Sequence, residues 1–253
     1  ISGSPPQDGT GAWGLSRPLK NLYLPEGKPM ATQTLNNERA YPERAHSTSA
    51  SSRLTRWLPI SMLLIAAVLL IASISMPYWG MVLNAPQYPG GLEMRVFVNH
   101  MTGDEDPRLD EVREIDGLNH YIGMKSLYDA AQLEQAISVP GIIVMAVALV
   151  VTAFFRRRWV WLLAVPALVF PVVFLGDLAF WLNYYGQNLD PYAPLSSAIG
   201  PFTPTILGEG IIGQFSTTAY VSPGWIMATV ASVLVLGALL LRGFEHRRSR
   251  QER

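Results

Sequence analysis

Histidine and methionine side chains occur together twice near the middle of the sequence. His120 and Met124 lie four residues apart in the string LNHYIGM, residues 118–124, and on a helix that spacing would place both side chains on one face. His100 and Met101 form a second, adjacent pair. Imidazole nitrogen and thioether sulfur together suit copper, particularly Cu(I). The residue types therefore predict a copper site made by His120 and Met124, with His100 and Met101 as secondary ligands.

The absence of cysteine limits which residue types could bind a metal. A chain with no cysteine has no disulfide bonds, thiolate metal sites or cysteine nucleophile, so a metal would be held by His, Met or carboxylate. Both residue types also have structural uses, because Met fills irregular apolar cores and His hydrogen-bonds loop backbone. The alternative interpretation of His120 is a hydrogen-bonded side chain in a loop region, with no metal.

Three other patterns have simpler explanations. Residues 208–213 match GxGxxG literally, but a dinucleotide site also needs a preceding strand and a following helix, so we predict flexible loop glycines. The acidic run at residues 104–116 lacks the spacing of a calcium loop and indicates a solvated turn. Asp177 interrupts an apolar stretch; we expect it to fix the docking of the outer loops, with a proton relay as the alternative. No nucleophile–base pair can be named, which predicts a protein that is not an enzyme.

The composition is that of a membrane protein. Hydrophobic residues make up 49% of the 253 residues, charged residues 15%, and the formal net charge of zero gives no reason to expect a nucleic-acid partner. Four apolar stretches approach the roughly 20 residues that a bilayer-spanning helix needs; they cover residues 57–79, 138–155, 159–183 and 223–241. The predicted fold is an all-α membrane protein of two helical hairpins, with a small extracytoplasmic cap.

The rest of the chain is assigned around these spans. Residues 1–52 are rich in Gly, Pro, Ser and Asn and are predicted to be a disordered tail, followed by a membrane domain at 53–253. Residues 1–29 precede the first methionine. One explanation is that they are upstream sequence and not part of the native protein. Outer loops are expected at 80–137 and 184–222. In the first loop, residues 93–101 alternate like a strand and 117–127 read as a short helix; the second loop is expected to be irregular.

Arginines mark the side of the membrane on which each helix end lies. They precede the first span, join the second to the third and follow the fourth, at Arg53, Arg56, Arg156, Arg157, Arg158, Arg242, Arg247, Arg248 and Arg250. Lys and Arg are enriched on the cytoplasmic side of membrane proteins. We therefore expect both termini in the cytoplasm of a bacterium, the two long loops outside, and the lipid bilayer of the inner membrane as the surrounding medium.

Two more strings accompany LNHYIGM: LNYYGQNLDPYAPL at residues 182–195 and PFTPTILGEGIIGQF at 201–215. With them the chain resembles an uncharacterised family of multi-pass membrane proteins encoded beside nitrous-oxide reductase and copper-delivery genes in bacterial clusters. The resemblance covers residues 86–240. Relatives often have His where this chain has Gln187, which removes one possible ligand from a site spanning both loops.

The resemblance implies an accessory role for an extracytoplasmic respiratory copper enzyme such as nitrous-oxide reductase. That role would be copper supply, maturation or electron delivery, with the copper enzyme or a copper chaperone as partner. The alternative is a structural or assembly subunit of a membrane complex that holds no metal. A third hypothesis is a small-solute transporter. It is less consistent with the sequence, because only one charged residue lies within the predicted spans.

Overall fold

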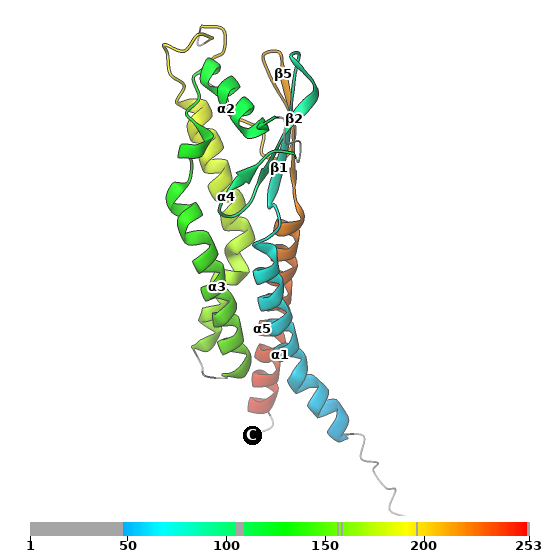
Figure 1. The fold of residues 1–253 in the computed structure, drawn as a ribbon. Coiled ribbons are helices and arrows are strands. Elements are labelled where there is room, and N and C mark those ends of the chain that lie inside the picture. Colours follow the sequence, from blue (N-terminus) through cyan, green and yellow to red (C-terminus); the bar gives the residue numbers. More distant parts are fainter. Residues whose placement is uncertain (1–47, 105–108, 156, 158, 196, 252–253) are drawn as a thin grey trace, which may run out of the picture. The chain divides into compact units, whose positions relative to one another are not determined.

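The computed structural model describes residues 48–251, except for residues 105–108, 156, 158 and 196; of residues 48–56 and 248–250 it describes only the backbone. Residues 1–47 of the predicted tail lie outside this range, and residues 48–52 belong to the first helix. The chain is mostly helical. Four long helices, shown in Figure 1, are α1 (Thr48–Ser73), α3 (Gln132–Phe154), α4 (Val165–Gln187) and α5 (Pro223–Gln251).

Three stretches are long and apolar enough to cross a membrane. They are Gln132–Phe154, Val160–Gln187 and Pro223–Arg247, and a shorter apolar helix covers Trp57–Ser73. The helices pack α1 against α5 and α3, and α4 against α5. Alanines fill the interfaces, among them Ala66, Ala228 and Ala231 with no exposed surface, and such small residues let helix backbones approach closely. The prediction of long apolar helices is therefore confirmed for three full-length spans.

The first predicted span is too long at its C-terminal end. Helix α1 ends at Ser73 and strand β1 begins at Trp79, although the apolar stretch continues to residue 79. Pro77 stands between them and cannot continue a helix. The hydroxyl groups of Ser73 and Tyr78 hydrogen-bond each other at 2.6 Å, which fixes the bend, and burial raises the pKa of Tyr78 to about 12. The chain therefore leaves the helices through a buried, hydrogen-bonded corner.

A five-stranded antiparallel sheet corrects the all-α prediction. Its order is β3-β2-β1-β5-β4, and its strands are β1 (Trp79–Ala85), β2 (Tyr88–Val96), β3 (Met101–Thr102), β4 (Gly208–Ile212) and β5 (Phe215–Val221). The second outer loop is thus not irregular throughout, because β5 pairs with β1 from the first. The pairing brings sequence segments more than 120 residues apart into one layer.

Two turns explain why the strands were misplaced. The predicted strand at 93–101 is broken, because the Phe97 amide donates to the His100 carbonyl at 2.9 Å and separates β2 from β3. The GxGxxG glycines are not a flexible loop either. Gly208 and Gly210 lie in β4, and Gly213, with φ of 59°, opens a two-residue turn to β5. A residue with positive φ at this position is typical of tight hairpins.

Helix α2 (Glu111–Ile122) covers one face of the sheet (Figure 1). The core between them contains Trp79, Leu83, Leu92, Met94, Val112, Ile115 and Phe215. The Asp110 side chain caps the helix by accepting from the Arg113 amide. Trp79 is fully buried, and its Nε1 donates to the Ile206 carbonyl at 2.6 Å. The cap is therefore a sheet and a helix with their own core, joined to the long helices through β1 and β5.

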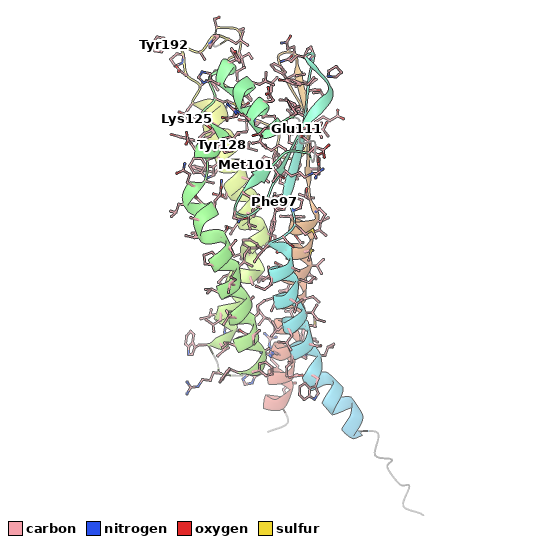
Figure 2. The ribbon with its side chains drawn as sticks, in the orientation of Figure 1. Phe97, Met101, Glu111, Lys125, Tyr128 and Tyr192 are labelled. Atoms are coloured by element: carbon pink, nitrogen blue, oxygen red, sulfur yellow. The ribbon has the colours of Figure 1, made fainter. Side chains whose placement is uncertain are left out.

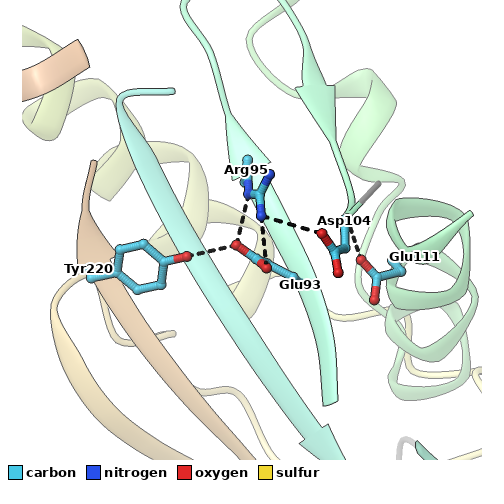
Figure 3. Close-up of polar contacts among 5 residues, drawn as sticks. All are labelled: Glu93, Arg95, Asp104, Glu111 and Tyr220. Atoms are coloured by element: carbon cyan, nitrogen blue, oxygen red, sulfur yellow. Dashed lines mark hydrogen bonds and ion pairs between the residues drawn. The ribbon is translucent and has the colours of Figure 1, made fainter. Parts of the chain in front are cut away.

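The other face of the sheet carries a polar network, shown in Figure 3. Glu93 accepts from Arg95 Nε at 2.8 Å and from the Tyr220 hydroxyl at 2.9 Å, and Arg95 reaches Asp104 at 3.4 Å. The Tyr220 ring lies over Gly80, where an added Cβ would meet it at 2.7 Å. Arg95 lowers the pKa of the Glu93 carboxyl by hydrogen bonding. The network joins β2 to β5 across the central strand.

Candidate functional site

The string LNHYIGM forms the end of α2. Gly123 adopts a left-handed backbone with φ of 87°, its amide donates to the His120 carbonyl at 3.1 Å, and the Met124 amide donates to the Asn119 carbonyl at 2.9 Å. These two bonds are those of a Schellman motif, which ends a helix and satisfies its last carbonyls. The short helix predicted over 117–127 is thus confirmed only as far as Ile122.

This helix end separates the two main candidate ligands. The His120 side chain is exposed, whereas Met124 is 7% exposed and packs inside. The spacing argument required a helix continuing through Met124, and the helix ends two residues earlier because Gly123 is left-handed. The expectation that His120 and Met124 share a helical face is therefore wrong. Copper binding stays a prediction for each residue by itself, and variants of each one would distinguish a cavity site at Met124 from a site at His120.

The three strings that carry the family resemblance meet in one place. The Asp190 amide donates to the Gly123 carbonyl at 2.8 Å, and the Leu195 amide donates to the Tyr121 carbonyl at 3.0 Å. The third string joins through the Phe202 amide, which donates to the carbonyl of Gly186 at 3.0 Å. A Cβ at Gly123 would lie 2.7 Å from the Asp190 carbonyl oxygen. The motif glycines thus permit backbone segments to dock directly on each other.

Gln187 lies at this junction as well. Gln187 is the last residue of α4, and its Nε2 donates to the Thr203 hydroxyl at 3.2 Å. That hydroxyl donates in turn to the Asn183 side chain at 2.9 Å. Gln187 is exposed. In this chain the residue therefore links α4 to the second outer loop.

A cavity of about 360 Å³ lies between the cap and the helices α3 and α4. Three of the four predicted ligands line it: His100, Met101 and Met124. They come from the β2–β3 turn, from β3 and from the segment after α2. Figure 2 shows Met101 where the sheet faces the long helices. The cavity also includes Met94, a residue that spacing did not single out because it lies within a strand and has no histidine neighbour.

His100 is the exposed polar residue of the cap wall. Its ring stacks on Phe97 with centroids 4.3 Å apart, and its Nδ1 lies 2.8 Å from the Asn99 side-chain oxygen. An amide oxygen only accepts hydrogen bonds, so this contact is consistent with a proton on Nδ1. In that neutral tautomer, Nε2 would be the ring nitrogen that binds a metal.

The opposite wall of the cavity carries two carboxylates. Asp177 of α4 and Glu134 of α3 both line it. The expectation that Asp177 fixes the docking of the outer loops stays a prediction. Glu134 was missed because α3 begins at Gln132, before the predicted residue 138. Trp181, one turn after Asp177, has a buried Nε1 that makes no hydrogen bond within the described part of the chain. Its interaction with the Asp177 carboxyl group falls short of hydrogen-bond geometry.

Within the described residues, nitrogen and oxygen side chains alone do not form a metal site. Among the described residues, no three His, Asp or Glu side chains are grouped closely enough to hold an ion. A copper site in the cavity would therefore depend on methionine sulfur. That donor set fits Cu(I), which accepts thioether and imidazole ligands.

Comparisons of the chain with models of known protein families, with curated proteins and with solved structures give no match. The candidate site is consequently defined by its geometry and by the residue types that line the cavity.

Proposed function

We propose that the protein is an accessory membrane protein that handles copper for an extracytoplasmic respiratory copper enzyme such as nitrous-oxide reductase. The observation that supports the proposal is the shared cavity of His100, Met101 and Met124. These residues were selected by type and by their spacing in the sequence, and they come from separate segments of the fold. Met94 adds a third thioether to the same wall.

The burial of these side chains fits reversible binding of Cu(I). Met94 and Met124 are 3% and 7% exposed, whereas His100 is exposed. Imidazole at the rim would meet the ion first, and thioethers inside would hold it. Both ligand types are neutral, so the charge of the ion would be offset by the carboxylates of Asp177 and Glu134 across the cavity. Neutral soft ligands hold Cu(I) without trapping it, which suits transfer to a partner.

A Cu(I) competition assay tests the proposal. Purified full-length protein would be loaded with Cu(I) against a chromogenic chelator and compared with Met124→Leu, which conserves volume and removes the sulfur. We expect the variant to bind at least about tenfold more weakly, about 1.4 kcal/mol, because a buried thioether is lost. Equal copper retention by wild type and Met124→Leu would contradict the proposal.

His120→Ala is the matched control. His120 belongs to the same string but is exposed at the end of α2 and does not line the cavity, so its removal should leave copper affinity unchanged. Loss of copper in His120→Ala with retention in Met124→Leu would move the site out of the cavity.

A structural or assembly subunit is the second candidate, and the edge of the sheet favours it. Strand β4 lies at the edge, and its Ile211 is 82% exposed. An exposed apolar edge strand can pair with another chain. Protein that retains no copper but co-purifies with a membrane complex through β4 would establish this role in place of copper handling.

The orientation proposed for the protein places the cap outside the cytoplasm. Arg242 of α5 binds the backbone carbonyls of Thr152 and Ala153 at the end of α3 far from the cap, and arginines cluster at cytoplasmic helix ends. We expect a reporter fused after Pro201 to be active outside the inner membrane and one fused after Arg253 to be active in the cytoplasm. A cytoplasmic signal from Pro201 would contradict this orientation.

A further inference from the structure

The turn between β2 and β3, residues 97–100, is anchored on the long helices. Val98 is 7% exposed and belongs to the same core cluster as Leu63 of α1 and Ala228 of α5. The Phe97 amide donates to the His100 carbonyl and closes the hairpin. Phe97, Val98 and His100 all line the cavity. The backbone of the turn therefore carries His100 at a fixed place on the cavity wall.

Two side chains of the same turn hold the imidazole ring of His100. The Phe97 ring is stacked on it, with an angle of 11° between the ring planes, and this contact sets the plane of the imidazole. The Asn99 side-chain oxygen lies 2.8 Å from Nδ1 and contacts one edge of the ring. Asn99 is exposed and does not line the cavity. Its contact with His100 is therefore made from outside the candidate site.

The contact with Asn99 bears on which ring nitrogen is free to bind a metal. The protonated nitrogen of a neutral histidine is set by the hydrogen bond that the nitrogen makes, and the Asn99 amide oxygen can only accept. Histidines that bind metals usually donate their second ring N–H to an oxygen acceptor in this way. Without the acceptor, the proton would be shared between Nδ1 and Nε2.

We propose that Asn99 is a positioning residue for copper binding: it holds His100 with the proton on Nδ1, so that Nε2 is free for the ion. Asn99 does not touch the ion itself. The metal in this inference rests on the proposed function, whereas the effect of Asn99 on the His100 ring does not depend on copper. The two are therefore tested separately.

Nitrogen NMR of isotope-labelled histidine in the copper-free, full-length protein tests the ring. The protein would be studied in detergent at mildly alkaline pH, with the His100 signals identified by their loss in His100→Ala. We expect the Nδ1–H form to predominate in the wild type and a mixture of both forms in Asn99→Ala. An identical tautomer in the wild type and Asn99→Ala would overturn the inference, whether or not the protein binds copper.

The Cu(I) competition assay tests the consequence for the metal. Asn99→Ala should bind Cu(I) about tenfold more weakly, because loss of a partner that orients a ligand typically lowers metal affinity by this amount or more. Alanine fits the turn, since the backbone of Asn99 is not left-handed. Asn99→Asp keeps an oxygen acceptor and should retain the wild-type affinity. Asn84→Ala removes an exposed asparagine of the sheet that does not line the cavity and should change nothing.

A double variant shows whether Asn99 acts through His100. His100→Ala should weaken Cu(I) binding, and adding Asn99→Ala to it should cause no further loss. Equal losses from Asn99→Ala with and without His100, or a loss in Asn99→Asp as large as in Asn99→Ala, would overturn the inference. Copper retention that depends on Met124 and His100 but not on Asn99 would overturn the inference alone. No retention by the wild type would overturn the proposed function as well.

Discussion

Replacing Gly123 with alanine is expected to destabilise the cap by about 2–4 kcal/mol. The left-handed backbone at φ of 87° is unfavourable for alanine. The new Cβ would also lie 2.7 Å from the oxygen and 2.8 Å from the nitrogen of the Asp190 backbone, so the Asp190–Gly123 hydrogen bond would be lost. The thermal unfolding midpoint of the purified protein in detergent would measure the effect.

Gly117→Ala is the control for this change. Gly117 lies inside the same helix, and an added Cβ would meet no atom within 4 Å. Alanine is favoured over glycine in a helix interior by up to about 1 kcal/mol, so this variant should melt at the same temperature or higher. A Gly123→Ala variant as stable as Gly117→Ala would show that the Schellman turn does not dock on the second outer loop as described.

Replacing Trp79 with alanine is expected to cost about 3–5 kcal/mol, the usual range for removing a buried large aromatic side chain. Trp79 has no exposed surface and joins the core of the cap. Its Nε1 also holds the Ile206 carbonyl, which ties the second outer loop to the first strand of the sheet. Unfolding in denaturant, followed by circular dichroism, would measure the loss.

Trp79→Phe separates packing from the hydrogen bond. Phenylalanine keeps part of the apolar contact and leaves the Ile206 carbonyl without its donor, for which we expect about 1–3 kcal/mol. If Trp79→Phe were as stable as the wild type, the indole N–H would not contribute to holding the second outer loop, and the loss in Trp79→Ala would be packing alone.

The helices were predictable from the sequence because a bilayer-spanning helix is defined by length and apolar composition. Their ends were harder to place. The apolar stretch continues through Tyr78 and Trp79, and composition does not distinguish a buried strand from the last turn of a helix. At α3 the predicted helix began too late. Glu134 lies inside the helix, although a charged residue there is more typical of a loop.

The union of the local hairpins into one sheet was not predictable, because the pairing of β1 with β5 is long-range. Strand β1 lies between β2 and β5, and β5 follows it by more than 120 residues. The local signal for the β4–β5 hairpin was present at Gly213, but the glycine-rich string around it also reads as loop. Cross-strand contacts such as Tyr220 over Gly80 have no local counterpart in the sequence.

The sequence singles out residue types for a copper site, and that site stays a prediction. Its geometry was not predictable, although Met101, Met124 and His100 line one cavity. His120 does not, because the glycine that ends α2 turns Met124 inward and leaves His120 exposed.

X-ray absorption spectroscopy at the copper edge of the Cu(I)-loaded protein tests the copper proposal most directly. It reports which elements surround the ion. The account predicts sulfur neighbours with one nitrogen ligand in the wild type, and fewer sulfur neighbours in Met124→Leu. A coordination shell of nitrogen and oxygen alone, or a sulfur shell that is identical in Met124→Leu, would contradict a thioether site in the cavity.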